Sequence, residues 1–281
     1  MNLQDTFCWN NVFTLFCLRG EENKQFLHGQ TTANILNVQS SNLLRTCWLS
    51  PTGRFKALLE VQFLEEDIRF IVLGGDPENV LQGFQKVIFP SDKVEVKNIG
   101  NIRRLQKISI HKPWSQSYVE WCDPGETIPA TFVDFQDAAS SYIEEWRINQ
   151  GLPIGANELN AESNPYELGL SDFVDLNKGC YLGQETMAKL KNGSQIKQQL
   201  RFWQGGTKDF GGKELDNIRI QSPSNNNAGF ITSYMKSSTG LNIGLAMIRR
   251  RFLASKELFI FNRDNSIKLS APVGFVDYLS E

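Results

Sequence analysis

The order in which strands and helices are expected along the chain constrains its fold more than any other feature of the sequence. The apolar pattern predicts, in order, a strand at 12–18, a helix at 21–29, strands at 43–49, 54–64 and 68–73, a helix from residue 77, and two strands ending near residue 111. Two helices among mainly antiparallel strands are typical of an α+β domain built on ferredoxin-like units. They argue against a doubly wound parallel sheet.

Two of the expected helices are marked by the residues at their start. Asp76 is a natural N-cap, and Pro77 after it is a natural first helical residue. Residues 138–149 predict a later helix, capped by Ser140 or Ser141 and stopped by a Gly-Leu-Pro sequence.

The character of the sequence changes near residue 196. From there on, six short strand-like runs are separated by clusters of Gly, Ser and Asn, a spacing typical of a small antiparallel barrel or sandwich. We therefore expect an α+β core of two interleaved subdomains over residues 1–195 and a separate β module over residues 196–281.

Charge and cysteine content exclude several classes of function. Because 29 Lys and Arg face 31 Asp and Glu, the net charge of -2 gives no field that attracts a polyanion. The one dense basic run, "IRRRF" at 248–252, lies in an expected strand, where its arginines alternate between faces and mark a solvated edge. Direct nucleic-acid binding is therefore disfavoured.

The five cysteines are odd in number and widely spaced, and the chain has two histidines, so neither a disulfide framework nor a zinc site is expected. No run approaches the 18 apolar residues of a membrane span, and the N-terminus lacks the pattern of a secretion signal. We expect a soluble cytoplasmic protein without membrane partners, and the stroma or matrix of an organelle stays open.

The stretch "NKGCYLGQE" at 177–185 is the best candidate for a site. Cys180 lies beside Lys178 and just before an expected helix, and both a cation and a helix N-terminus stabilise a thiolate. Gly179 and Gly183 indicate an unusual backbone conformation or a close approach to a ligand. On these residues alone, a reactive thiol and a buried apolar cysteine both stay open.

These residues resemble the signature of the YgfZ family, folate-binding proteins related to the aminomethyltransferase of the glycine cleavage system. The family pattern is Lys-Gly-Cys-aromatic-x-Gly-Gln-Glu, which "KGCYLGQE" matches. The resemblance extends over most of the chain through "FLHGQTT" (26–32), "SPTGR" (50–54), "RINQGLP" (147–153), "AGFITSY" (228–234) and "IGLAMIRR" (243–250).

The resemblance implies an aminomethyltransferase-like folate-binding core followed by a C-terminal antiparallel β-barrel. It also implies that tetrahydrofolate or a one-carbon derivative binds in a central cleft. Family members support the synthesis or repair of iron–sulfur enzymes, including one that modifies tRNA, so the expected partners are folate and iron–sulfur enzymes or cluster-assembly proteins. No permanent metal is expected, because one cysteine cannot hold an iron–sulfur cluster unaided.

Carried over residue by residue, the resemblance makes Cys180 the reactive thiol. It also implies a set of residues that bind the cofactor: Gln30, Thr31, Thr32, Arg147, Lys178, Gly179, Tyr181, Gly183, Gln184 and Glu185. Two departures from the family pattern weaken this set. Lys189 stands where the family often has arginine, and Ala33-Asn34 follows the early segment in place of Asn-Asp.

Whether the chain is an enzyme stays open. Lys56 and Ala57 lie near the acidic positions of the related aminomethyltransferase, and neither can act as a base, which disfavours glycine-cleavage chemistry. Glu60, on the same expected face as Lys56, could replace them only through a shift of register. Lys56 and Arg54 could also form a positive rim for the glutamate tail of folate. An aminomethyltransferase-type enzyme and a direct tRNA-binding protein stay as alternatives.

Overall fold

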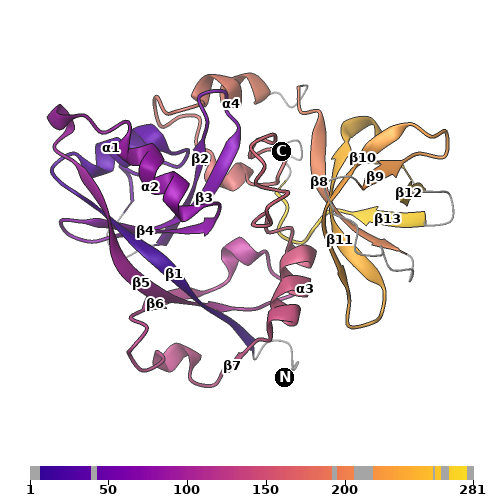
Figure 1. Cartoon of the computed structure of the whole chain (residues 1–281), viewed down its shortest axis with the longest axis horizontal. Coiled ribbons are helices and arrows are strands. Elements are labelled where there is room, and N and C mark those ends of the chain that lie inside the picture. The colour runs from indigo at the N-terminus through magenta and orange to yellow at the C-terminus, as the bar shows by residue number, and fades with distance from the viewer. Residues whose placement is uncertain are drawn as a thin grey trace.

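The computed structural model describes residues 7–38, 43–191, 195–205, 218–255, 257–260 and 266–276. Figure 1 shows the N-terminal strands and helices on the left, in indigo to magenta, and the C-terminal strands on the right, in orange to yellow. None of the helices in these residues is long and apolar enough to cross a membrane.

The N-terminal part is organised around one sheet. Its strands are β1 (Phe7–Arg19), β2 (Leu43–Leu49), β3 (Phe55–Phe63), β4 (Ile68–Gly74), β5 (Glu95–Lys107), β6 (Val119–Cys122) and β7 (Gln136–Asp137). Their order is β2-β3-β4-β1-β5-β6, and β7 pairs with β1. The run β3-β4-β1-β5 is antiparallel throughout, which is the ferredoxin-like arrangement with an extra strand at each edge. The predicted α+β class is confirmed.

The helices are α1 (Asn23–Gln30), α2 (Pro77–Gln85), α3 (Ser140–Gln150) and α4 (Gln184–Leu190). Asp76 caps α2 as expected, because its carboxylate accepts from the backbone N–H groups of Glu78 and Asn79. Phe84 and Val80 anchor this helix to the sheet, and burial of a side chain such as Phe84 stabilises the fold by about 2 kcal/mol.

Two details of the sequence prediction are wrong. The two strands expected before residue 111 are one strand, β5, because the long β1 pairs along its whole length and a bulge opposite Leu15 absorbs the irregularity near Gly100. Ser140 and Ser141 lie inside α3, and Ala139 occupies the N-cap position without a side-chain bond.

The C-terminal part is a closed barrel. Its strands are β8 (Gln198–Gly205), β9 (Arg219–Gln221), β10 (Asn227–Lys236), β11 (Asn242–Arg249), β12 (Leu258–Ile260) and β13 (Ser266–Ser270), in the order β10-β11-β8-β13-β12-β9. All six expected runs contain a strand, and each strand pairs antiparallel with its neighbours, which confirms the predicted barrel. The division of the chain at residues 195 and 196 stays a prediction.

Candidate functional site

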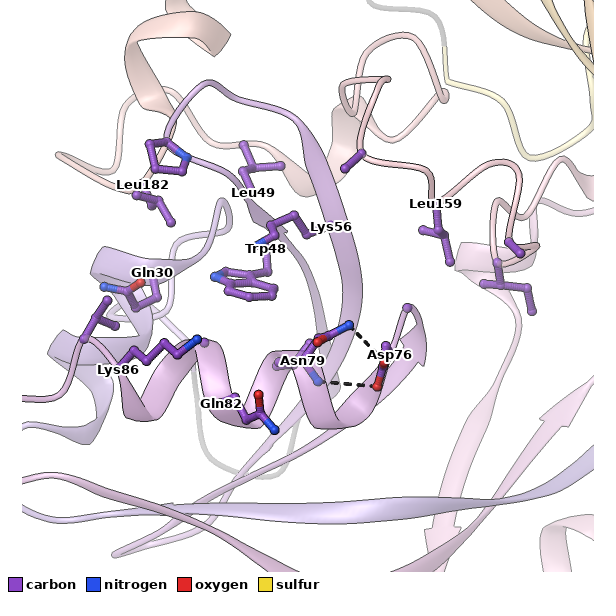
Figure 2. A pocket seen from close by; sticks show the side chains of 18 residues that line it. Gln30, Trp48, Leu49, Lys56, Asp76, Asn79, Gln82, Lys86, Leu159 and Leu182 are labelled. Carbon is purple, nitrogen blue, oxygen red and sulfur yellow. Dashed lines mark hydrogen bonds between the residues drawn. The ribbon is translucent and has the colours of Figure 1, made fainter. Parts of the chain in front are cut away.

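A cavity of about 940 Å³ lies where the β2–β3 hairpin, helix α2 and the loop at 154–161 meet. Figure 2 shows side chains from all three segments around it. We call it the pocket, and its lining residues are Gln30, Trp48, Leu49, Pro51, Lys56, Gly75, Asp76, Asn79, Val80, Gln82, Gly83, Lys86, Val87, Ile154, Ala156, Leu159, Ala161 and Leu182.

The indole ring of Trp48 is the central aromatic surface of the pocket. It packs edge-on against Phe84, with ring centroids 5.6 Å apart, and against Gly83, where a β-carbon would come within 2.4 Å of the ring. Only 5% of the Trp48 surface is exposed, and its Nε1 has no hydrogen-bond partner among the described residues. Figure 2 shows this nitrogen on the edge of the ring that lies toward Gln30. A buried N–H without a partner favours a bound acceptor.

Two lysines supply positive charge to the pocket. A β-bulge pairs Trp48 with Ala57 and Leu49 with Phe55, so Lys56 has no partner across the ladder. Its ammonium lies over the Trp48 ring, 4.1 Å from the centroid. Lys86, at the C-terminal end of α2, also lines the cavity.

One carboxylate, that of Asp76, belongs to the lining residues. Its oxygens accept from the Asn79 side chain as well as from the first backbone N–H groups of α2. This carboxylate is therefore used to begin the helix. The pocket as a whole suits a flat, largely apolar molecule that carries hydrogen-bond acceptors and negative charge.

The predicted motif residues meet beside the pocket and form what we call the motif joint, made of residues 28–33 and 173–183. The Lys178 ammonium donates to the carbonyl oxygens of His28, Thr31 and Ala33, each at 2.6 Å. In return, the Lys178 carbonyl lies 2.8 Å from Nε2 of His28. The motif lysine therefore binds the backbone of the other predicted segment.

The motif joint also holds the strand that carries Trp48. Thr31 pairs with Trp48 in an isolated antiparallel bridge, and the Thr32 side chain accepts from the Cys47 backbone N–H at 3.0 Å. Thr31 and Thr32 are both buried, so of the three predicted residues in this segment Gln30 is the one that lines the pocket.

Burial lowers the pKa of Lys178 to about 7, and the charge of Asp175 opposes this shift. The three carbonyl acceptors also favour the charged form, since an ammonium has three N–H groups to donate. Tyr181 is buried next to it, with the Lys178 ammonium 5.0 Å from its ring centroid.

Gly183 is the place where the motif loop meets the β2–β3 turn. Its φ of 84° lies in the left-handed region, and a β-carbon there would come within 2.9 Å of the Ser50 carbonyl oxygen. Helix α4 begins at the next residue, with Gln184 half-buried and Glu185 exposed in its first turn. Neither side chain is among those that line the pocket.

Cys180 is exposed, whereas the other four cysteines of the chain are buried. The structure therefore excludes the alternative that Cys180 is a buried apolar residue. Gly179 before it has a φ of 102° and is exposed as well. Cys180 does not line the pocket, but Leu182 of the same loop does.

Arg147 lies outside this arrangement. Its guanidinium donates to Glu144, to the Leu152 carbonyl, to Glu158 and to the Ser233 hydroxyl of β10, so it links α3 and the following loop to the barrel. Burial disfavours its charge, but the hydrogen bonds and charges of the two glutamates outweigh burial and raise its pKa. The contacts of Arg147 are internal ones, and a folate contact for it stays a prediction.

Glu60 forms a closed cluster of its own. Its carboxylate, with no exposed surface, accepts from Arg45, Arg104 and Trp121 at 2.8 to 3.0 Å. Burial opposes ionisation, but the two guanidinium groups outweigh burial and lower the pKa of Glu60 to about 2. The bulge at Lys56 interrupts the alternation of side chains between the two faces of β3. Lys56 therefore lines the pocket and Glu60 does not, so the shift of register considered for Glu60 does not bring it there.

Sequence reasoning missed most of the pocket. Trp48, Lys86 and Gln82 line it, and the sequence shows them as a strand residue and as polar residues of an amphipathic helix. One signal was available: Asn79, Gln82 and Lys86 recur at a spacing that puts them on one side of α2, next to Gly83.

No family model matches the chain. Among curated proteins, a putative chloroplastic transferase of Arabidopsis thaliana is 27% identical over 223 residues, which cover 64% of this chain and 52% of that protein. An aminomethyltransferase of Caldanaerobacter subterraneus is 30% identical over 107 residues, 38% of this chain and 27% of the relative. The chain thus spans about half or less of the length of these two relatives.

The tRNA-modifying protein YgfZ of Colwellia psychrerythraea is 27% identical over 220 residues, 64% of this chain and 65% of that protein. The resemblance to YgfZ that the motifs indicate is confirmed. Among solved structures, the glycine cleavage system aminomethyltransferase T of Bartonella henselae matches with a TM-score of 0.74 at 11% identity, over 98% of this chain and 88% of the other. This likeness confirms the aminomethyltransferase-like fold.

Proposed function

We propose that this chain binds tetrahydrofolate, or a one-carbon derivative of it, in the pocket, and that it supports the synthesis or repair of iron–sulfur enzymes. The observation that carries the folate proposal is the pocket itself: a cavity of about 940 Å³ lined by two lysines and by Trp48, whose buried N–H has no partner among the described residues. The likeness to YgfZ and to aminomethyltransferases supports it.

The chemistry of a reduced folate fits these groups one by one. Its pterin ring carries a carbonyl oxygen and ring nitrogens that can accept from the Trp48 indole and from the Gln30 amide. Its benzoyl ring can pack against the half-buried, apolar side chain of Leu159, which lines the pocket. Its glutamate carboxylates match the ammonium of Lys56.

The accessory role rests on the family resemblance and on the exposed thiol. Cys180 lies in the loop that supplies Leu182 to the pocket, and it faces solvent. A thiol in that position is accessible to a partner protein, and it lies two residues before Leu182, which lines the proposed folate pocket. Iron–sulfur enzymes, including one that modifies tRNA, are the proposed clients.

Aminomethyl transfer is the weaker candidate. The first strand after the β2–β3 turn presents Lys56 and Ala57 where the related enzyme has acidic residues, and Glu60 is closed off by two arginines. Among the described residues that line the pocket, Asp76 is the one carboxylate, and its oxygens cap α2. A general base for that reaction is thus missing from the described lining.

Calorimetric titration with 5-formyltetrahydrofolate, a chemically stable reduced folate, tests the binding claim. The wild-type chain is expected to bind, and Lys56→Met to bind about fivefold more weakly, because one exposed ion pair contributes up to about 1 kcal/mol. Lys24→Met, which removes an exposed lysine of α1 outside the pocket, is the matched control. Wild-type protein that releases no heat of binding contradicts the folate proposal.

The accessory role needs a test in cells. In a strain that lacks the protein, the activity of iron–sulfur enzymes and the content of modified nucleosides in tRNA are expected to fall. The wild-type chain should restore both, and Lys56→Met should restore them less well than Lys24→Met. Equal rescue by a chain that no longer binds folate contradicts the coupling of folate to this role.

A further inference from the structure

A second hollow, of about 890 Å³, lies between the core and the start of the barrel. We call it the basic groove. The side chains that line it include five basic groups and two carboxylates: Arg54, Lys197, Arg249, Arg250, Arg251, Glu162 and Glu167. This gathering of positive charge departs from the chain as a whole, whose net charge is -2.

The three consecutive arginines all line the groove because strand β11 ends at the first of them. β11 ends at Arg249, and residues Arg250–Phe252 form a short 3₁₀ turn, so the arginines do not alternate between two faces as the sequence pattern predicts. The backbone N–H of Arg250 donates to the Lys197 carbonyl at 2.9 Å, which fixes the turn against the start of β8. All three arginines therefore line one hollow.

One of the two carboxylates of the groove is withdrawn from solvent. Glu167 is only 4% exposed, and its carboxylate accepts from the Asn164 backbone N–H at 3.2 Å. Glu162 is exposed, and its backbone carbonyl accepts from the Arg54 guanidinium. The exposed basic groups outnumber the exposed acidic ones, so the groove suits an anionic ligand.

The basic groove and the pocket adjoin each other. Ala161 lines both. Pro51 lines the pocket and Arg54 lines the groove, and these two residues belong to one turn, closed by the bond from the Ser50 N–H to the Arg54 carbonyl at 2.8 Å. Ala161 therefore marks the place where the lining of the pocket meets that of the groove.

We propose that the basic groove binds the γ-linked glutamate tail of a folylpolyglutamate whose pterin lies in the pocket. This inference rests on the proposed folate function and names the form of folate that the chain takes. Each added glutamate brings one carboxylate, so the tail offers a row of anions to Arg54, Lys197 and Arg249–Arg251. RNA fits the groove less well, because none of the described residues that line it has an aromatic side chain for base stacking.

The test compares 5-formyltetrahydrofolate with one and with five glutamates by calorimetry at low salt. The pentaglutamate is expected to bind the wild-type chain about tenfold more tightly, which corresponds to about 1.4 kcal/mol. Arg249→Ala combined with Arg251→Ala should reduce this preference to near unity and leave the monoglutamate affinity unchanged. Both side chains are exposed, and thermal unfolding checks that the fold is kept.

The matched control is Arg219→Ala combined with Lys268→Ala, which removes two exposed basic groups from barrel strands β9 and β13 outside the groove. It should keep the tenfold preference. The preference of the wild-type chain should also shrink as salt is raised to about 150 mM, because exposed ion pairs are screened.

Three results overturn the proposal, and they differ from one another. If neither folate binds, the folate function fails and the groove proposal fails with it. If both folates bind equally well to the wild-type chain, the groove proposal alone fails. If tRNA binds at about 150 mM salt and the groove variant abolishes that binding without changing the ratio of the two folates, the groove is an RNA site.

Discussion

The motif joint and the pocket lie side by side, but the buried N–H groups of Lys178 and Trp48, one in each region, are used in opposite ways. In the motif joint the Lys178 ammonium is bound by three backbone carbonyls. In the pocket the Trp48 N–H is buried without a partner among the described residues. The difference teaches that the lysine of the most specific sequence motif marks where the site is held together, while Trp48, whose N–H is left for a ligand, lies on a neighbouring strand.

Strand β3 contains the same contrast within five residues. Lys56 belongs to the pocket, and Glu60 belongs to a closed cluster in which every polar contact is internal. If this contrast is correct, substitutions of polar residues that are bonded within the protein change stability. Substitutions of polar residues that line the pocket change ligand affinity.

Glu60→Gln is expected to lower the free energy of unfolding by about 4 kcal/mol, because it leaves the buried guanidinium of Arg104 without its counter-charge. Since the folded-state pKa of Glu60 is lowered to about 2, its contribution is present above the unfolded pKa and is lost as pH falls from about 4.5 toward 2. Urea unfolding at pH 7 and at pH 3 measures both effects.

The matched control for this variant is Glu65→Gln, which changes an exposed glutamate in the turn after β3 and should alter the free energy of unfolding by less than about 0.5 kcal/mol. A stability difference between wild type and Glu60→Gln that stays the same from pH 7 to pH 3 contradicts the assignment of the ion pair.

Lys178→Met is expected to cost about 3 kcal/mol of unfolding free energy, because it leaves buried carbonyl oxygens of residues 28–33 without their donor. Lys189→Met, at an exposed position of α4, is the control with little expected effect. The affinity for 5-formyltetrahydrofolate, measured at a temperature where the variant is folded, should change much less than the stability. A loss of affinity without a loss of stability breaks the comparison.

The pH dependence of the wild-type chain adds a second check at Lys178. Burial lowers its folded-state pKa to about 7, below the unfolded value, so the unfolded chain binds more protons between these two values. The stability of wild type relative to Lys178→Met should therefore rise as pH increases from about 7 to about 10. A falling difference over this range contradicts the direction of the shift.

Several features of the fold could be predicted from the sequence, because they depend on local signals. Asp76 and Pro77 fixed the start of α2 because N-capping depends on neighbouring residues alone. Likewise, the alternating runs after residue 196 indicated the barrel strands, because period-two patterns are local. The class of the fold and the place of the motif loop followed from such local signals.

The pocket could not be predicted in the same way. Trp48, Lys86 and Leu159 come from three separate elements, and only the packing of α2 on the sheet brings them together. The position of Lys56 depends on a bulge that no local pattern announces. The role of Lys178 depends on a contact with a segment about 150 residues away, so the motif could be recognised but its bonds could not.

Trp48→Phe is expected to weaken binding of 5-formyltetrahydrofolate about tenfold, since the ligand loses a buried donor worth about 1.4 kcal/mol, while the apolar ring is kept. The free energy of unfolding should fall by about 1 kcal/mol, because the smaller ring packs less well on Phe84. Calorimetry and urea unfolding measure the two quantities.

Phe84→Leu is the control for Trp48. It perturbs the ring that supports Trp48 but does not line the pocket, so it should reduce stability and leave affinity nearly unchanged. If Trp48→Phe reduces the free energy of unfolding as much as Lys178→Met and leaves folate affinity intact, then Trp48 has a structural role like that of Lys178. The contrast between the motif joint and the pocket is then wrong for Trp48.

Cys180→Ser should have the smallest physical effect of the series. Because the side chain is exposed, the free energy of unfolding is expected to change by less than about 0.5 kcal/mol, and folate affinity by less than about twofold. A thiol reagent should modify one cysteine in the native wild-type chain and none in this variant, because the other four cysteines are buried.

Rescue of iron–sulfur enzyme activity in cells tests whether the exposed thiol of Cys180 has a function of its own. A Cys180→Ser chain that folds and binds folate normally but fails to rescue places the chemistry on the thiol, at the edge where the motif joint meets solvent. Full rescue by the same chain assigns the motif a purely supporting role, in which Lys178 and Gly183 hold the wall of the pocket and the thiol is incidental. The first result means that one residue of the motif joint, Cys180, takes part in function directly. The second means that the motif joint only supports the pocket.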